Sequence, residues 1–408
     1  MPSKYRNFRN IMPWILLFLE AVLIILFYFL FSGRDAHVST ISYPAFQDVN
    51  HMVIFGFGFF LTFLKRYGFS STGFNLLIIV LGVQCSVLIE HLLGFRIHKR
   101  EDEDGLKRIT KAAVSMTAVV ISTGAVLGKA NPVQLILMAV VEIIAFHMSR
   151  WINITSLRIS DSISMMHVHL FGAYFGLAVS SRFSEPSPRT EKNASTPKSD
   201  LLSMLGTLFL WVFWPSFNSV LLEKNNTKAI YNTYFALAVS AVTAFVLSLL
   251  TAKDGKFRMT DIHSAVLAGG VTVGYAADII KYPWIAMILG LLASGIAVLG
   301  SYCLQRCLHP ALKIHDASGI HFTFGLPGVL GALAQVVLSA LENWTESSRL
   351  DYLVMIPIGA FCLTISVALI TGFITGLIVN LKLFKTTPVS KYFEDQFYWE
   401  FPHLAVGF

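Results

Sequence analysis

Three ionisable side chains in an apolar stretch are the residues best suited to chemistry in this sequence. Asp161, His167 and His169 stand at the head of the segment DSISMMHVHLFGAYFGL (161–177). Ionisable groups are costly to bury in hydrocarbon, so within a membrane they mark a polar path through the protein. An imidazole suits such a path because its pKa lies near 6.5 and it can both donate and accept hydrogen bonds. The alternative is that these residues only cap and pack the helix.

Composition indicates a membrane protein. Apolar residues make up 55% of the 408 and charged residues only 13%, whereas soluble domains carry about a quarter charged residues. The net charge of +7 is spread through the loops rather than gathered in one basic block, which favours a role in membrane orientation over nucleic-acid binding. Four cysteines in apolar surroundings are too few for a disulfide framework.

Apolar runs long enough to span a bilayer recur along the chain. A transmembrane helix needs about 20 apolar residues, and the sequence contains twelve candidate segments, the second of them short. They lie near residues 12–32, 50–64, 73–94, 111–128, 133–152, 164–182, 201–222, 230–251, 261–280, 283–304, 321–342 and 352–381. We therefore predict an all-α membrane protein with about twelve transmembrane helices and both termini on the same side.

The basic residues predict which side that is. With the termini inside, most of the 31 Lys and Arg residues fall in the inside segments, and positive charge accumulates on the cytoplasmic side of membrane proteins. We therefore expect a multi-pass protein with cytoplasmic termini. A polar segment with three prolines, residues 184–200, is typical of a flexible linker and divides the chain near its middle.

Two similar segments stand on either side of this linker. The sixth apolar segment contains HLFGAYFG (169–176), and the eleventh contains FGLPGVLG (324–331), 155 residues later. Each begins with a bulky residue and continues with small residues that let helices approach closely. Five spans lie between the first span and the linker, and five between the linker and the last span. An odd number per half inverts the topology, so we predict two inverted five-helix halves, about 50–182 and 201–342, as in many transporters.

Five segments carry a resemblance to a known family. They are GAVLGK (124–129), HLFGAYFGL (169–177), LFLWVFWPSFNS (208–219), SAVLAGGVTVG (264–274) and KYFEDQFYWEFPHLAVGF (391–408). With them the chain resembles the ammonium transporter and Rh superfamily, and within it the Rh blood group polypeptides of the erythroid type. The resemblance covers nearly the whole chain. It implies one membrane domain over 1–408 with the ammonium transporter fold, a cytoplasmic tail over 382–408, and a trimer of subunits that each have a central pore.

The resemblance also implies pore residues. By motif, Asp161 matches the family's pore aspartate and His169 the first of two facing histidines. Phe217, in PSFNS, matches one phenylalanine of the outer gate, and Val114 falls at the other gate position. The second histidine precedes Gly-x-Pro-Gly in the related Rh glycoproteins, and here that position is Phe324.

Phe324 changes the chemistry expected of the pore. Ammonia crosses such a pore after ammonium gives up its proton, and a pair of imidazoles offers hydrogen bonds on the way. A phenyl ring offers none and is larger, so Phe324 would dry and narrow the lumen opposite His169. Valine in place of an aromatic ring at position 114 also removes a surface on which a cation could stack. We therefore predict a degenerate pore.

Two further histidines, His167 and His321, are candidates for pore support. His167 stands two residues from His169, about 200° round the helix, which turns it towards a neighbouring helix rather than the same lumen. His321 precedes Phe324 by three residues and could supply an imidazole one turn nearer the membrane surface.

The remaining reactive side chains do not form a recognisable centre. Cys303 and Cys307 lie at a predicted cytoplasmic helix end, where free or acylated thiols are expected. Together with His309 and His315 their spacing fits a zinc site poorly. The sequence shows no nucleotide-binding loop, nucleophile motif or paired carboxylates, so we expect neither an enzyme nor a cofactor.

Two functions from different classes remain open. The resemblance implies a non-conducting subunit that joins the Rh-associated glycoprotein in a trimeric complex of the red-cell plasma membrane. Its acidic and aromatic tail, YFEDQFYWEF (392–401), is expected to be exposed and to meet the ankyrin-linked membrane skeleton. The alternative is a channel that conducts ammonia or carbon dioxide through its own modified pore. A third hypothesis, an ion-coupled transporter, lacks an obvious membrane-embedded ion site.

Overall fold

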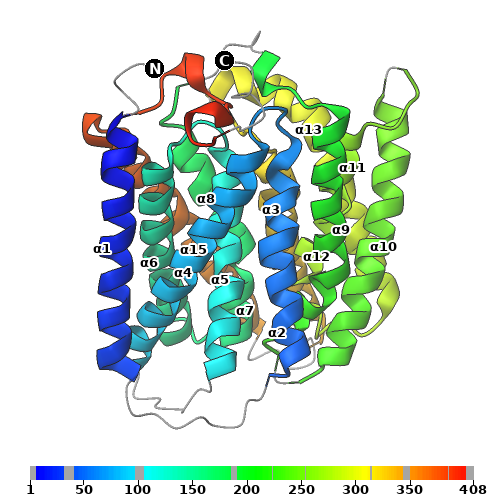
Figure 1. Cartoon of the computed structure of the whole chain (residues 1–408). Coiled ribbons are helices and arrows are strands. Elements are labelled where there is room, and N and C mark those ends of the chain that lie inside the picture. Colours follow the sequence, from blue (N-terminus) through cyan, green and yellow to red (C-terminus); the bar gives the residue numbers. More distant parts are fainter. Residues whose placement is uncertain are drawn as a thin grey trace.

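The protein is built from helices that run side by side in one bundle (Figure 1). The computed structural model describes residues 6–31, 41–96, 105–184, 191–222, 224–252, 254–312, 315–342, 350–384 and 386–400. Within these ranges the regular secondary structure is entirely helical, with no strand. The predicted all-α class is confirmed.

Each of the twelve predicted apolar segments contains helix within the residues that the structure describes, although the ninth, near 261–280, leaves regular helix after Val273. Eight are single helices: α1 (Arg6–Phe31), α4 (Gly68–Arg96), α5 (Gly105–Ala125), α6 (Pro132–Thr155), α9 (Pro197–Ser219), α10 (Asn226–Thr251), α13 (Pro283–Leu312) and α15 (Leu350–Val379). The others combine shorter pieces: α2 (Tyr43–Asn50) with α3 (Phe57–Phe60), α7 (Asp161–Met166) with α8 (Val168–Ser180), α11 (Met259–Ala265) with α12 (Ala268–Val273), and a π-helix (His321–Gly325) with α14 (Leu326–Glu342). Among the described residues, nine spans are long and apolar enough to cross a membrane by length and composition.

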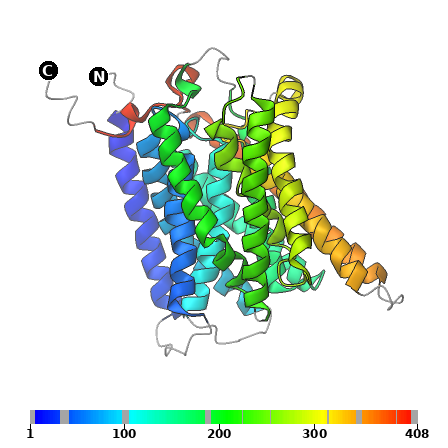
Figure 2. The same cartoon turned by 90° about the vertical axis from the view of Figure 1, so that its right-hand side faces the viewer.

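The start and the end of the described chain lie at the same end of the bundle, as an even number of spans requires. Figures 1 and 2 place the beginning of α1 and the segment 386–400 together at this end, which we call the tail face. The opposite end, near which α7 begins, is the far face.

Local sequence determines where two long helices begin. Before α6, the Asn131 side chain accepts a hydrogen bond from the Gln134 N–H (3.0 Å), and the Gln134 side chain accepts one from the Asn131 N–H (2.8 Å). Thr196 and Ser199 form the same capping box before α9. Such a box satisfies N–H groups that the first helical turn leaves free. Each helix opens with a proline, which has no N–H to satisfy.

Several residues of the bundle interior lie in or beside turns where the α-helix is irregular. A π-helix, His51–Gly56, separates α2 from α3, and the second π-helix opens the eleventh span. Regular α-helix is also interrupted at His167, between α7 and α8. π-Helical turns occur frequently at functional sites. Here Phe57, His169 and Phe324 lie in or beside these turns.

Glycines bring α8 and α14 against neighbouring backbones. Gly172 and Gly176 of α8 approach Ala118 and Ser122 of α5 so closely that a Cβ atom would overlap that backbone. Gly331 of α14 approaches the Thr272 carbonyl of α12 in the same way. Small residues at such positions let membrane helices pack closely, and the close approach predicted for the segments 169–176 and 324–331 is confirmed.

The expectation of an exposed tail is wrong for its middle part. Tyr392, Phe393 and Asp395 are buried, with 4%, 0% and 5% of their surface exposed. Phe393 has a left-handed backbone conformation (φ 62°), and its N–H donates to the Gly128 carbonyl (2.9 Å). Its ring packs against Gly128, where a Cβ atom would overlap it. These side chains are therefore used for packing within the molecule.

Asp395 completes the N-terminus of α4. Its carboxylate accepts hydrogen bonds from the N–H groups of Phe69 and Ser70, each at 2.9 Å. The Trp399 indole donates to the Ser70 hydroxyl at 2.9 Å. Burial raises the pKa of Asp395, and the hydrogen bonds from Ser70 and Phe69 oppose that shift. One of the tail's acidic residues, Asp395, is thus a helix cap supplied from a distant part of the chain.

Candidate pore

Aromatic rings meet in the bundle interior around His169. The imidazole is stacked with the Trp214 indole (centroids 5.7 Å apart, planes at 17°) and with the Phe324 ring (6.4 Å, 10°). It meets Phe217 edge to face at 5.8 Å. These side chains come from α8, α9 and the second π-helix. All four are buried, with at most 1% of their surface exposed.

The ring contacts continue beyond Phe324. Its centroid lies 5.9 Å from that of Phe57 and 6.1 Å from that of Phe60, and Phe60 lies 5.1 Å from His263. We call Phe217, Trp214, His169, Phe324, Phe57, Phe60 and His263 the aromatic column. None of them is more than 7% exposed. The column therefore offers almost no surface to water.

His169 brings polar atoms into the column. Its Nδ1 lies 3.3 Å from the Met166 carbonyl oxygen. An N–H donates to a carbonyl, so this contact assigns the proton to Nδ1 and a lone pair to Nε2. Nε2 is buried and has no hydrogen-bond partner among the described residues. The Phe324 ring, which faces the imidazole, cannot provide one.

The two gate positions differ in what they contribute. Phe217 contacts His169 as described above. Val114 of α5 is 0% exposed, and a valine brings no ring to the column. The residue that resemblance places at the second gate position is therefore an aliphatic core residue in this chain.

Two other histidines lie away from the column. His167 Nδ1 is 2.9 Å from Thr364 Oγ1 of α15, and its ring lies beside that of Tyr275 (5.8 Å). His321 packs edge to face on Tyr174 of α8 (5.9 Å). In the described part of the chain neither imidazole shares a ring contact with the column. Neither therefore supplies a second imidazole beside the first.

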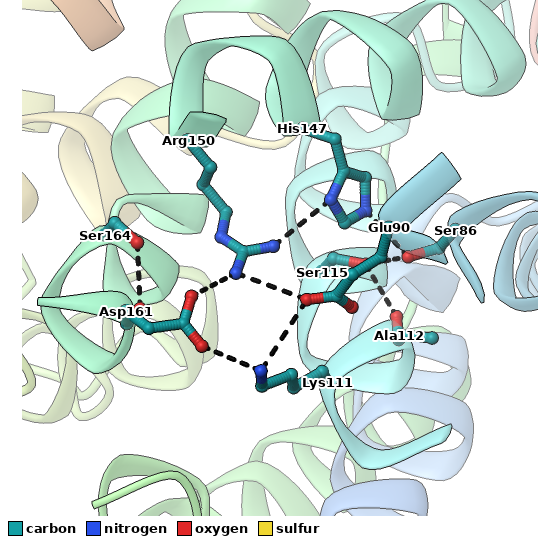
Figure 3. Close-up of polar contacts among 9 residues, drawn as sticks. All are labelled: Ser86, Glu90, Lys111, Ala112, Ser115, His147, Arg150, Asp161 and Ser164. Atoms are coloured by element: carbon teal, nitrogen blue, oxygen red, sulfur yellow. Dashed lines mark hydrogen bonds and ion pairs between the residues drawn. The ribbon is translucent and has the colours of Figure 1, made fainter. Parts of the chain in front are cut away.

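Asp161 belongs to a group of charged side chains near the far face, shown in Figure 3. Its carboxylate pairs with the Lys111 ammonium at 2.8 Å and with the Arg150 guanidinium. Glu90 lies 3.7 Å from Lys111 and 3.4 Å from Arg150. We call Glu90, Lys111, Arg150 and Asp161 the charged cluster. Two acids and two bases leave it without net charge, and only the Asp161 side chain, 43% exposed, is substantially open to water.

A hydrogen-bond chain leads from the charged cluster into the bundle (Figure 3). Arg150 Nη1 lies 3.1 Å from His147 Nδ1, and a guanidinium only donates, so Nδ1 accepts. His147 Nε2 then donates to the Ser86 hydroxyl (2.8 Å), which lies 2.8 Å from that of Ser115. With Asp161 included, these contacts join α4, α5, α6 and α7.

Sequence reasoning selected only Asp161 from this cluster. Glu90 and Arg150 stand inside apolar segments, and a charged group within a span signals a buried partner. That signal could have been used. Among the aromatic partners of His169, motifs identified Phe217 and Phe324, whereas Trp214 carried no comparable signal, because aromatic residues make up 13% of the whole chain.

A second aspartate lies towards the tail face. Asp316 accepts hydrogen bonds from the N–H groups of Ile320 (3.0 Å) and His321 (2.9 Å) at the start of the second π-helix. Burial raises the pKa of Asp316, and these N–H groups oppose the shift. Nearby, the buried Lys129 ammonium donates to the His315 carbonyl (2.8 Å). Asp316 thus holds the start of the second π-helix, which carries Phe324, by hydrogen bonds to its backbone.

The part of the chain that the structure describes contains no group of three His, Cys, Asp or Glu side chains that could hold a metal ion. The side chains of Cys303 and Cys307, the candidate acylation sites, lie outside the described residues.

Relatives match the chain along its whole length. Residues 13–396 match the Ammonium Transporter Family. The RH-like protein of Macaca mulatta is 43% identical over 423 aligned residues, which cover all of both chains. The blood group Rh(D) polypeptide of Rattus norvegicus and the blood group Rh(CE) polypeptide of Homo sapiens are each 42% identical, over 425 and 421 residues, and again cover all of both chains.

Solved structures share the fold. Rh50 of Nitrosomonas europaea, described as one of the Rhesus protein family of channels, is 29% identical with a TM-score of 0.76, over 90% of this chain and 94% of that one. Mep2 of Saccharomyces cerevisiae is 16% identical and has a TM-score of 0.65. The aligned region covers 87% of this chain and 91% of that one. Similarity in fold therefore extends well beyond similarity in sequence.

Proposed function

The chain belongs to the ammonium transporter family, and on that premise we propose that it is a subunit of an Rh-type membrane complex whose own pore does not conduct. The family is one of transporters and channels. The resemblance to Rh blood group polypeptides in the sequence motifs is confirmed by full-length relatives of that name.

The stack of Phe324 on His169 carries this proposal. A molecule crossing at this level must leave water and would meet only a few polar atoms, His169 Nε2 and Trp214 Nε1, among ring carbons. Moving a polar group out of water without a compensating hydrogen bond costs roughly 2–7 kcal/mol. The neighbouring rings of Phe57 and Phe60 extend the apolar stretch, which supports a centre that is closed to polar solutes.

The charged cluster supports the same proposal. A free carboxylate near a pore mouth attracts cations, but Asp161 already pairs with Lys111 (2.8 Å) and Arg150. Two fixed positive charges beside the carboxylate offset its attraction for an arriving ammonium ion.

We extend the proposal to partners and orientation. A subunit without conduction of its own fits a trimer with the Rh-associated glycoprotein in the red-cell plasma membrane, with the tail face in the cytoplasm. Because the middle of the tail is buried, contact with an ankyrin-linked skeleton would use its exposed residues, such as Val389, Gln396 and Glu400.

Ammonia flux tests the closed pore. The protein alone is placed in proteoliposomes, and the internal pH is followed after an ammonia pulse. We expect the wild type to match protein-free liposomes and Phe324→His, which restores a second imidazole, to raise the rate several-fold. Phe322→His is the matched control, because the Phe322 ring packs against Gly300 and has no described contact with the column. It should leave the rate unchanged.

One result would overturn the proposal. Wild-type flux comparable to that of a conducting Rh glycoprotein would favour the alternative, a channel. Repeating the assay with carbon dioxide would then show whether the channel conducts that gas as well.

Co-expression with the Rh-associated glycoprotein tests the complex. We expect affinity purification of one tagged chain to recover the other in a particle of trimer size. Recovery of homotrimers alone would contradict the mixed complex while leaving the closed pore untouched.

A further inference from the structure

Glu142 of α6 is a carboxyl group near the middle of a membrane span, and it is 0% exposed. In the part of the chain that the structure describes, its hydrogen-bonding partner is the Ser122 hydroxyl of α5, which meets Oε2. The other oxygen, Oε1, is buried and has no partner within the same residues. Neither the charged cluster nor the aromatic column includes this carboxyl group.

The Ser122 hydroxyl has one proton, and two acceptors compete for it if Glu142 is ionised. Ser122 Oγ lies 2.9 Å from the Val119 carbonyl oxygen of the preceding turn and also contacts Glu142 Oε2. A carbonyl only accepts hydrogen bonds, and so does an ionised carboxylate. With an ionised Glu142, one of these two contacts would therefore join two acceptors with no proton between them.

A protonated carboxyl group satisfies both contacts. Its O–H donates to Ser122 Oγ, and the Ser122 O–H donates to the Val119 carbonyl, so each proton has an acceptor. The unmatched Oε1 is then the carbonyl oxygen of a neutral group. Leaving a neutral group unsatisfied in the interior costs less free energy than leaving a charge unsatisfied.

The nearest Lys and Arg on these two helices are too far away to pair with Glu142. Arg150 follows Glu142 by eight residues on α6, and Lys111 precedes Ser122 by eleven on α5. At about 1.5 Å per residue, these separations are about 12 Å and 16 Å along the helix axes. Both bases belong to the charged cluster, where they contact Asp161 and Glu90.

None of the other titratable side chains described around α6 contacts Glu142. These are His147 on α6, Cys85 on α4, His167, His169 and Tyr174 on or beside α8, and Lys129 in the turn before α6. Lys129 is the only fixed cation among them. Its ammonium donates to the Ser180 hydroxyl (2.7 Å) and to the His315 carbonyl (2.8 Å).

We propose that Glu142 is a proton-binding site inside the bundle, where the folded protein holds one proton at neutral pH and uses it to join α6 to α5. Without this proton, Ser122 can donate either to Glu142 or to Val119, so one of the two contacts is lost. Ser122 also forms the surface on which Gly176 of α8 packs. The site therefore lies where three helices meet, and alkaline pH should loosen their contact. The proposal does not depend on whether the column conducts.

Infrared difference spectra of the full-length protein in nanodiscs test for the proton directly. The C=O bond of a protonated carboxyl group absorbs at a higher frequency than an ionised carboxylate. We expect the spectrum of wild type minus Glu142→Gln at neutral pH to contain the protonated band. Glu90→Gln is the matched control, because Glu90 pairs with Lys111 and Arg150 and its removal should take away carboxylate bands. A Glu142 spectrum with carboxylate bands alone would overturn the proposal.

Ser122→Ala keeps the carboxyl group and removes the acceptor of its proton. We expect the protonated band to remain and to move to higher frequency, because the carboxyl group loses its hydrogen bond. Ser149→Ala is the control on α6, since the buried Ser149 hydroxyl has no hydrogen-bond partner in the described chain, and it should leave the band in place. A band that stays unchanged in Ser122→Ala would contradict the hydrogen bond through which the proton joins the two helices.

The pH dependence of unfolding is an independent measurement. An exposed glutamate loses its proton at about pH 4.3, so from about pH 5 to 8 the folded protein binds one proton that the unfolded chain has released. Stability therefore falls as the pH rises. The unfolding equilibrium constant should increase by up to about tenfold per pH unit more in the wild type than in Glu142→Gln. Equal pH dependence in the two proteins would show that Glu142 holds no proton.

Discussion

Two helix segments repeat one geometry with different chemistry, one beginning near the far face with α7–α8 and the other near the tail face with the second π-helix and α14. In each, a ring follows an aspartate by eight residues, and a glycine follows the ring by seven. The residues are Asp161, His169 and Gly176 in the first, and Asp316, Phe324 and Gly331 in the second. The two rings are stacked with each other, and the two glycines pack against α5 and α12.

The differences lie in what the side chains bind. Asp161 pairs with cations from two other helices, while Asp316 accepts hydrogen bonds from two N–H groups of its own segment. At the centre an imidazole with an unmatched nitrogen faces a phenyl ring. Packing and chemistry are therefore separable in this fold. Backbone approach is alike in the two segments, and single side chains decide whether the centre can accommodate a polar molecule.

The largest expected effect concerns the shared packing. Gly176→Val and Gly331→Val each push a side chain into a neighbouring backbone, and we expect each to lower the free energy of unfolding by about 3 kcal/mol. Gly295→Val, with open space around its Cβ position, serves as the control. Denaturation in detergent micelles measures all three. Strong destabilisation at only one of the two packed glycines would break the comparison.

Removing the two aspartates should lower the free energy of unfolding by different amounts. Asp161→Ala leaves Lys111 and Arg150 with Glu90 as the remaining carboxylate of the charged cluster. We expect a loss of about 2 kcal/mol, below the ~3–5 kcal/mol of a fully buried pair because the Asp161 side chain is 43% exposed. Asp316→Ala removes two cap-like hydrogen bonds and should cost about 1 kcal/mol. Equal losses in the same denaturation assay would show that the charged cluster stabilises no more than a cap.

The smallest effect is expected at the centre. His169→Phe makes both central rings phenyl and removes the buried Nε2 that has no partner. We expect stability to stay the same or to rise by up to about 1 kcal/mol, with ammonia flux unchanged from the wild type. A clear loss of stability would show that the hydrogen bond from Nδ1 to the Met166 carbonyl outweighs the cost of the unmatched Nε2, and it would sharpen the contrast between the two rings.

Hydropathy was sufficient to locate the nine described helices that are long and apolar enough to cross a membrane, because a bilayer requires about 20 apolar residues wherever the chain crosses it. The small residues at Gly176 and Gly331 also predicted close packing correctly. The positions at which regular α-helix is interrupted could not be predicted. Nothing local distinguishes the turn at His167 or the π-helix around Phe324 from regular helix, because both depend on the helices packed around them.

The candidate site was only partly visible in the sequence. Motifs identified Asp161, His169 and Phe324, but their partners depend on which helices are neighbours. The stack of Trp214 on the imidazole joins α8 to α9 across the linker, and no spacing rule predicts it. The tail was misjudged for a related reason. A cap whose acceptor and donors lie in distant parts of the chain leaves no local pattern.

That cap has a consequence for biosynthesis. Asp395 follows Phe69 and Ser70, whose N–H groups it binds, by 326 and 325 residues. During translation α4 is made long before its cap exists, so its N-terminal turn lacks these two hydrogen bonds until Asp395 has been made. A polypeptide that ends before this aspartate never closes the contact. The docked tail therefore distinguishes a chain that extends past Asp395 from one that stops before it.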